Sequence, residues 1–188
     1  MVLLMPANGS RHFDNSKKKE GGEEMLKEEK AAERWKEIEV VRGMPVHIHR
    51  LSACAQAVMR KVNRHQGAEL PSEPRKIGFA RASVRELGFH EITEFARICM
   101  RVGALGGDFC PYWAAPQLRG KYPDQPAGEV LRLMTVPTLI PVRGMKHPFQ
   151  AVLSLEHDEE KGVVIACREG APETLLSLDN EVVFMIRG

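Results

Sequence analysis

The chain has 188 residues, of which 43% are apolar and 28% are charged, and its formal net charge at pH 7 is +2. This length allows one domain, or two small ones, with a hydrophobic core. The composition excludes a collagen-like chain, a wholly disordered chain and a disulfide-stabilised miniprotein. No apolar run reaches the roughly 20 residues that cross a bilayer, so no membrane span is predicted.

Charge is distributed unevenly along the chain. Residues 1–41 carry a net charge of −1, residues 42–146 a net charge of +8 and residues 147–188 a net charge of −5. A basic central segment attracts phosphate backbones or an acidic partner surface. Alternatively, the acidic C-terminal segment folds against the basic segment and neutralises it, and the sequence leaves both readings open.

The N-terminal 43 residues differ in composition from the rest. Residues 1–19 are polar, aperiodic and basic, which predicts a disordered basic tail or, alternatively, a weak organellar transit peptide. Residues 20–43 are rich in Glu, Lys and Ala, with charge pairs three and four residues apart, and this pattern predicts a charged helical extension. Its sparse apolar stripe is a candidate surface for docking to a partner. The docking candidates are Met25, Trp35 and Ile38.

Residues 44–188 are predicted to form a single α+β domain. After a short strand-like stretch, Ser52 begins a helix that runs to about Gln66, because apolar residues recur three and four positions apart. Ser83 and Glu86 have the spacing of a capping box. The pattern after them predicts one kinked helix or two short helices, ending by residue 103.

The remaining chain is predicted to be a loop followed by strands. Residues 103–128 are rich in Gly, Pro and aromatic residues, which predicts a long and functional loop. From Glu129 the apolar period becomes two, with a turn at 158–162 and a tight hairpin at 179–180. The segment 182–186 is apolar on both faces, which predicts a central strand. The predicted fold class is therefore α+β, with N-terminal helices packed on a C-terminal antiparallel β-meander.

The sequence contains fragments of known motifs, and none is complete. The segment 90–94 (HEITE) lacks the second histidine that a zinc metalloprotease helix needs. His47 and His49 share one face of an extended segment, but no third ligand stands nearby. Gly120-Lys121 has neither the glycine five residues earlier nor the Ser or Thr after the lysine that a P-loop needs. No metal and no cofactor are predicted.

The four cysteines, Cys54, Cys99, Cys110 and Cys167, are isolated in the sequence. They form neither a zinc motif nor a redox motif, which predicts an intracellular, reducing compartment such as the mitochondrial matrix or the cytoplasm. All except Cys110 lie within apolar patterns, which predicts buried thiols. Cys110 lies in the aromatic loop and would act as a nucleophile only if the fold brings a histidine to it.

The basic side chains of the central segment are candidate contacts to a nucleic acid or to an acidic partner. The planar guanidinium of arginine binds two phosphate oxygens, and aromatic residues of the 103–128 loop would add base stacking. No signature of an RNA-binding module accompanies them. The candidate contacts are Arg60, Lys61, Arg64, Arg75, Lys76, Arg81, Arg85, Arg119 and Lys121.

These features favour a non-catalytic structural or accessory subunit of a larger assembly with protein partners, such as the ribonucleoprotein of an organellar ribosome. A polar tail and a sparse helix of this kind gain order by wrapping around a partner. Two alternatives remain open. One is a free-standing RNA-binding module, and the other is a small enzyme with its site at the 103–128 loop. No catalytic residue is predicted.

Overall fold

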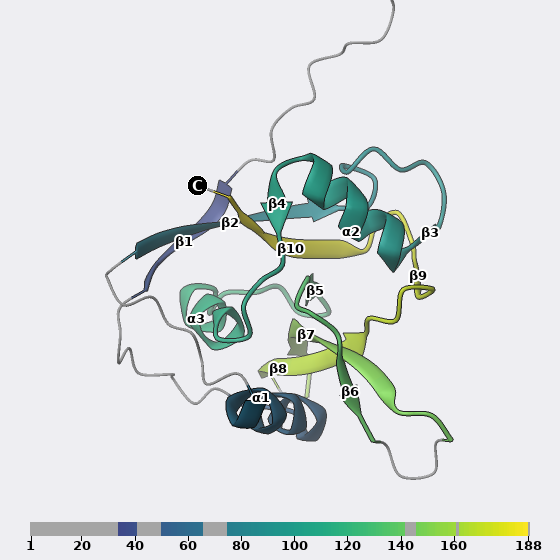
Figure 1. Ribbon diagram of the computed structural model, residues 1–188. Coiled ribbons are helices and arrows are strands. Elements are labelled where there is room, and N and C mark those ends of the chain that lie inside the picture. The colour runs from purple at the N-terminus through teal and green to yellow at the C-terminus, as the bar shows by residue number, and fades with distance from the viewer. Residues whose placement is uncertain (1–33, 41–49, 66–74, 142–145, 161, 188) are drawn as a thin grey trace, which may run out of the picture.

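The computed structural model describes residues 34–40, 50–65, 75–141, 146–160 and 162–187, with the side chains of 63–65 excepted (Figure 1). The helices are α1 (Ala53–His65), α2 (Phe95–Ala104) and α3 (Ala114–Lys121). The strands are β1 (Arg34–Val40), β2 (Arg75–Ser83), β3 (Thr93–Glu94), β4 (Gly107–Asp108), β5 (Val130–Leu133), β6 (Thr138–Ile140), β7 (Phe149–Asp158), β8 (Gly162–Glu169), β9 (Leu175–Leu176) and β10 (Glu181–Ile186).

One mixed sheet dominates the described part of the chain. Its strand order is β1-β2-β10-β5-β7-β6, with β8 on the other side of β7 and β4 paired to β10. The central strand β10 is antiparallel to β2 and parallel to β5. Strands β3 and β9 form a separate two-stranded sheet. Contacts between segments far apart in sequence therefore build the fold.

Helices cover both faces of this sheet. Along β10, Val182 and Phe184 pack in the core that includes buried residues of α2, whereas Val183 packs in the core that includes buried residues of α1 and α3. Figure 1 shows α2 on one side of the sheet and α1 and α3 on the other. The prediction that 182–186 is a central strand is confirmed, and its apolar character on both faces follows from the two cores.

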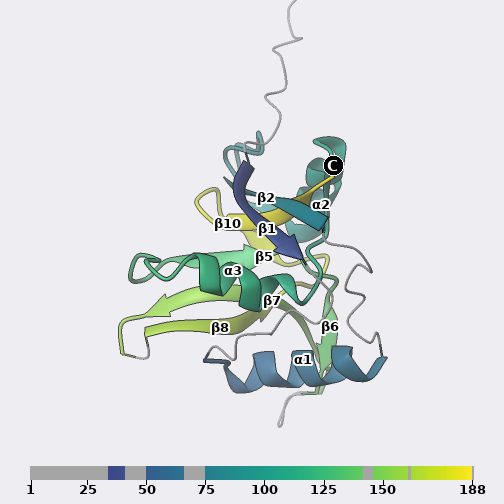
Figure 2. The ribbon, with the colours of Figure 1, turned by 90° about the vertical axis from the view of Figure 1, so that its left-hand side faces the viewer.

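Helix α3 lies in the concave side of the curled sheet, where it contacts β1 as well as β7 and β8 (Figure 2). Ala114, Ala115 and Leu118 are fully buried on it, and the small alanines allow the helix to approach the strands closely. The segment 103–128 thus contains a packed helix and the strand β4, and is not the continuous loop that its glycine and proline content predicted.

The predicted arrangement of N-terminal helices on a C-terminal antiparallel meander is wrong. Strands β1 and β2 come from the N-terminal half of the chain and join the same sheet as the C-terminal strands. Residues 34–40, predicted as part of a charged helix, form β1 and pair with β2. Ile38 and Val40 are buried two positions apart, so a strand places both in the core.

Two helix predictions have different outcomes. Ser52 begins α1 as predicted, because its Oγ accepts a hydrogen bond from the Ala55 N–H at 3.2 Å. Ser83 and Glu86 also form their capping-box bonds, at 2.7 and 3.2 Å. That box caps only a turn, however, because Gly88 follows with a φ of 92° and the chain leaves the helical region.

Two hairpin predictions also differ. Strands β7 and β8 pair through the predicted turn, where Gly162 has a φ of 68°. The predicted hairpin at 179–180 is wrong, since β9 pairs with β3 while β10 pairs with β2. The predicted tail at 1–19, the docking candidate Met25 and the strand-like stretch with His47 and His49 lie outside the described residues.

Candidate functional site

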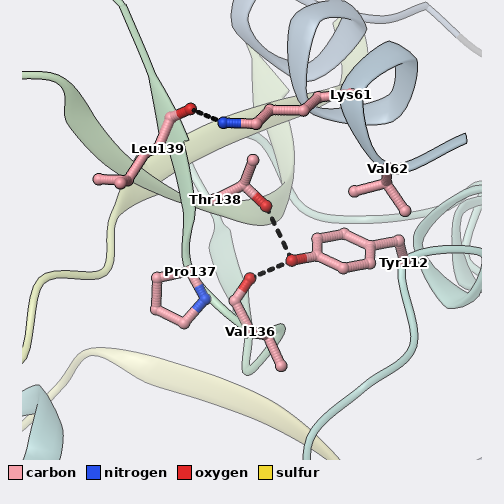
Figure 3. Close-up of a pocket in the computed structure, with 7 residues that line it drawn as sticks. All are labelled: Lys61, Val62, Tyr112, Val136, Pro137, Thr138 and Leu139. Atoms are coloured by element: carbon pink, nitrogen blue, oxygen red, sulfur yellow. Dashed lines mark hydrogen bonds between the residues drawn. The ribbon is translucent and has the colours of Figure 1, made fainter. Parts of the chain in front are cut away.

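A groove lies between α1 and the segment that leads into β6. Its volume is about 280 Å³, just below the range of about 300–1,000 Å³ for small-molecule pockets. This size suits one or two side chains better than a large ligand. The lining residues, drawn in Figure 3, are Lys61, Val62, Tyr112, Val136, Pro137, Thr138 and Leu139.

The side chains of Tyr112 and Lys61 each bond a backbone carbonyl of this segment (Figure 3). The Tyr112 hydroxyl donates to the Val136 carbonyl, and it lies 2.8 Å from the Thr138 hydroxyl. Because the Tyr112 hydroxyl proton is donated to the Val136 carbonyl, the Thr138 hydroxyl is the donor in the second bond. Burial raises the pKa of Tyr112 above its usual value, although the bond with Thr138 opposes that shift. Tyr112 is therefore a neutral hydrogen-bonding group.

Lys61 covers an open strand edge. Among the described strands, β6 pairs only with β7, so its other edge has backbone groups without a strand partner. The Lys61 Nζ donates to the Leu139 carbonyl of that edge at 2.8 Å (Figure 3). An ammonium has three N–H donors, so the remaining two can bind a carboxylate while this bond persists.

The apolar part of the groove is about half exposed. Val136 and Leu139 expose 52% and 48% of their surface, and Pro137 lies between them. Aliphatic side chains at such exposure beside a strand edge are typical of surfaces that bind another polypeptide. The groove thus offers apolar contact, an open backbone edge and a positive charge at one place.

Comparison with known proteins adds no relative to this geometry. No protein-family model matches the chain, and neither the curated protein sequences nor the solved structures contain a match to it. Within the described ranges, no group of three or more His, Cys, Asp or Glu side chains is placed to hold a metal ion. None of the helices in those ranges has the length and apolarity to cross a membrane.

The nine basic residues predicted as contacts are spread over several elements. Arg60, Lys61 and Arg64 lie on α1, Arg75, Lys76 and Arg81 on β2, Arg85 in the following turn, and Arg119 and Lys121 on α3. Lys61 is the one that lines the groove. Arg60, Arg75 and Lys121 are exposed, and the Arg64 side chain is outside the described part of the chain.

Acidic partners neutralise three other basic candidates. Arg81 donates to Glu129 at 2.5 Å and also contacts Glu181, and all three side chains are largely buried. Burial lowers the pKa of Arg81, but its bonds to Glu181 and Tyr122 outweigh that and raise it. Arg85 pairs with Asp179 at 3.2 Å, and Lys76 lies 3.8 Å from Glu37, both at the surface.

Arg119 is inside the protein. It is 2% exposed, its Nη1 donates to the Gln125 side chain, and burial lowers its pKa. Its Nε and Nη2 are also buried and have no hydrogen-bond partner in the protein. Arg119 is a buried residue of α3. Its guanidinium therefore does not reach a phosphate backbone at the surface.

The docking candidates within β1 contact their own domain. Ile38 is 1% exposed and packs in the core with α1 and α3. Trp35 packs edge-to-face on Tyr122, with ring centroids 5.3 Å apart. A register shift between Arg34 and Lys36 marks a β-bulge, which changes the direction of the side chains around it. The Lys36 Nζ also lies 5.3 Å from the centroid of the Tyr122 ring.

Cys110, the candidate nucleophile, is buried. The residue is 2% exposed, and its Sγ–H donates a hydrogen bond to the Val183 carbonyl at 3.4 Å. Burial raises the pKa of its thiol well above the usual value, which disfavours the reactive thiolate. The structure places this thiol in the core of the sheet.

Sequence reasoning singled out Lys61 and noted the aromatic residues near Tyr112, but it missed the other wall of the groove. Residues 136–139 show no motif, and only the fold places them against α1. The sequence signal that was available is Pro137, because proline is confined to strand edges and ends. Pro137 indicates an edge strand, but it does not indicate which element packs beside that strand.

Proposed function

We propose that this chain is an accessory subunit of a larger assembly and that it binds an extended segment of a protein partner in the groove between α1 and β6. The observation that carries this proposal is the open edge of β6, flanked by the half-exposed Val136 and Leu139 and by the Lys61 ammonium.

The three features correspond to one known mode of peptide recognition. In β-strand addition, backbone hydrogen bonds to an open sheet edge give affinity, and pockets for alternate side chains give specificity. Here β6 supplies the edge, Val136 and Leu139 supply the apolar contact, and Lys61 supplies a charge. The partner segment is therefore expected to combine aliphatic side chains with an acidic side chain or a terminal carboxylate.

Two of the groove's own side chains already occupy positions that such a segment would use. Lys61 bonds the Leu139 carbonyl and Tyr112 bonds the Val136 carbonyl. Side chains that cover an edge in this way prevent unspecific strand pairing in the free protein. A partner would form backbone bonds beside the Lys61–Leu139 bond, and the two remaining N–H donors of the ammonium would bind its carboxylate.

The test is gradient sedimentation of the tagged full-length protein from its own cells, comparing the wild type with Leu139→Asp. The matched control is Met100→Asp, which adds the same charge at a side chain that is 68% exposed on α2. In Figure 1 α2 lies on the opposite side of the sheet from α1. Both variants are first checked for an unchanged melting temperature.

The expected result is fast sedimentation of the wild type and of Met100→Asp, with slow sedimentation of Leu139→Asp. Loss of fast sedimentation in Met100→Asp but not in Leu139→Asp would refute the groove as the docking site. Slow sedimentation of the wild type would refute the subunit proposal itself. A parallel gradient after ribonuclease treatment distinguishes a ribonucleoprotein, in which fast sedimentation collapses, from a protein-only assembly, in which it survives.

A further inference from the structure

Two cysteines that are far apart in sequence meet where α1 begins. Residue Leu51 pairs in parallel with Ile165 of β8, and the Ser52 N–H donates to the Ile165 carbonyl at 2.9 Å. Cys54 follows in the first turn of α1, and Cys167 lies two residues beyond Ile165 on β8. The backbone pairing therefore brings the two side chains to the same place.

The two thiols lie near each other. The Cys54 and Cys167 side chains both pack against the core that holds α1 to the sheet, and the Cys54 thiol is close enough to raise the pKa of Cys167. Each residue is only partly buried, so small reagents have access to the pair. Cys110, by contrast, is fully enclosed. Reversible oxidation of a thiol pair requires adjacency, access and a thiolate on the attacking cysteine, and the pair meets the first two conditions.

We propose that Cys54 and Cys167 are a redox-modification site, at which a low-molecular-weight disulfide such as glutathione disulfide converts the two thiols into a reversible disulfide bond between α1 and β8. Hydrogen bonds join the backbone on both sides of Leu51 to Ile165, and they hold the start of α1 against β8. The two cysteines therefore stay neighbours in the native fold, and a disulfide between them would bridge these two elements.

The chemistry has two exchange steps. The Cys54 thiolate attacks one sulfur of glutathione disulfide, which forms a mixed disulfide and releases one glutathione thiolate. The Cys167 thiolate then attacks the Cys54 sulfur and releases the second glutathione. Each released thiolate takes up the proton that a protein thiol has lost, so two protein thiols are oxidised and one glutathione disulfide is reduced to two thiols.

The order of the steps follows from the environment. Burial, together with the neighbouring Cys54 thiol, raises the pKa of Cys167 well above its usual value. A smaller thiolate fraction makes Cys167 the slower nucleophile, so it acts second. Once Cys54 is held in the mixed disulfide, the neighbouring Cys54 thiol no longer raises the pKa of Cys167.

The disulfide would close a long loop of chain and restrict the unfolded state. For a protein of this size, the expected rise in melting temperature is about 10 °C. The bond would also fix the start of α1, the helix that carries Lys61. This inference does not depend on the proposed function of the groove, because it concerns only the two thiols and their oxidation.

The experiment uses the full-length protein equilibrated in glutathione buffers of increasing oxidised fraction, followed by acid quenching and alkylation. Intact mass counts the remaining thiols, and peptide mapping identifies any cross-linked pair. The variants are Cys54→Ser and Cys167→Ser, with Cys99→Ser as the control, because Cys99 is a half-buried thiol on α2 outside the pair.

The wild type and Cys99→Ser are expected to lose the same two thiols to a Cys54–Cys167 cross-link and to melt about 10 °C higher. Dithiothreitol should reverse both effects. Cys167→Ser should instead accumulate glutathione on Cys54. Full alkylation of Cys54 and Cys167 in the most oxidised buffer would overturn the proposal, as would a cross-link to a different cysteine.

Discussion

The position of Gly170 yields a sharp test of how the chain packs against the sheet. Gly170 follows β8, and its N–H donates to the Gln150 carbonyl at 2.7 Å. A Cβ at this position would lie 2.3 Å from Cγ1 and 3.2 Å from Cγ2 of Val152. Val152 is itself fully buried. Gly170 is therefore required for space, and Gly170→Ala should be costly.

The magnitude follows from these distances. Ordinary carbon–carbon contact is about 3.5–4.0 Å, so Val152 or the backbone at Gly170 must move by more than about 1 Å. Overpacking of this kind costs about 1–3 kcal/mol. Because no mobile surface side chain is involved, we expect a cost near 3 kcal/mol. For a domain of this size, the melting temperature would fall by about 6–12 °C.

A double-mutant cycle separates the steric clash from other effects. Val152→Ala alone should cost about 2 kcal/mol, since it removes two buried methyl groups and leaves a small cavity. The double variant has no Cγ atoms in the way, so its cost should also be near 2 kcal/mol rather than the additive value of about 5 kcal/mol. The coupling free energy of about 3 kcal/mol reports the clash.

The assay is urea unfolding followed by circular dichroism, with the slope of the transition compared among variants. The control is Gly103→Ala in α2, where an added Cβ meets no atom within 4 Å and a gain of about 0.5–1 kcal/mol is expected. A Gly170→Ala protein within 0.5 kcal/mol of wild type, or an additive cycle, would refute the reasoning.

Three further predictions concern the helix cap, the groove and the buried thiol. Ser52→Ala should lower the free energy of unfolding by about 1 kcal/mol, measured by thermal melting, and an unchanged midpoint would contradict the capping role. The pKa of Tyr112 is raised by burial, so its contribution to stability is complete below its unfolded pKa of about 10 and is lost as pH rises through the higher folded value. Tyr112→Phe should therefore reduce the loss of stability above pH 10, followed in urea melts at several pH values, and an equal loss in both proteins would argue against it. Native Cys110 should resist alkylation until the protein unfolds, because its thiol is enclosed and its pKa is raised, and rapid labelling in native buffer would show that the thiol is accessible.

Local signals determined several parts of the fold correctly. Ser52 and the apolar spacing after it predicted α1, since a cap and a helical face depend on residues within a few positions. The alternation from Phe149 and the turn before Gly162 predicted the β7–β8 hairpin for the same reason. The capping box at Ser83 also formed, yet a single turn satisfied it, so a correct local bond did not imply a helix.

Predictions failed where competing local and long-range preferences met. Charge pairs in 34–40 favour a helix by only a few tenths of a kcal/mol each. Burial of Ile38 and Val40 in a strand paired to β2 stabilises more, and the register partner of Ile38 is Ile77, which is distant in the sequence. The glycine and proline content of 103–128 similarly concealed α3, which is stabilised by its contacts with β1, β7 and β8.

The candidate site shows the same division. The sequence by itself determined that Lys61 lies on a helix beside its apolar face, that 182–186 is apolar on both faces, and that the cysteines do not form a local motif. Only the tertiary structure decided that Lys61 covers the edge of β6 and that Cys54 lies near Cys167. The physical reason is that propensity, capping and periodicity act over a few residues, whereas strand pairing and side-chain contact depend on which distant segments the buried core brings together.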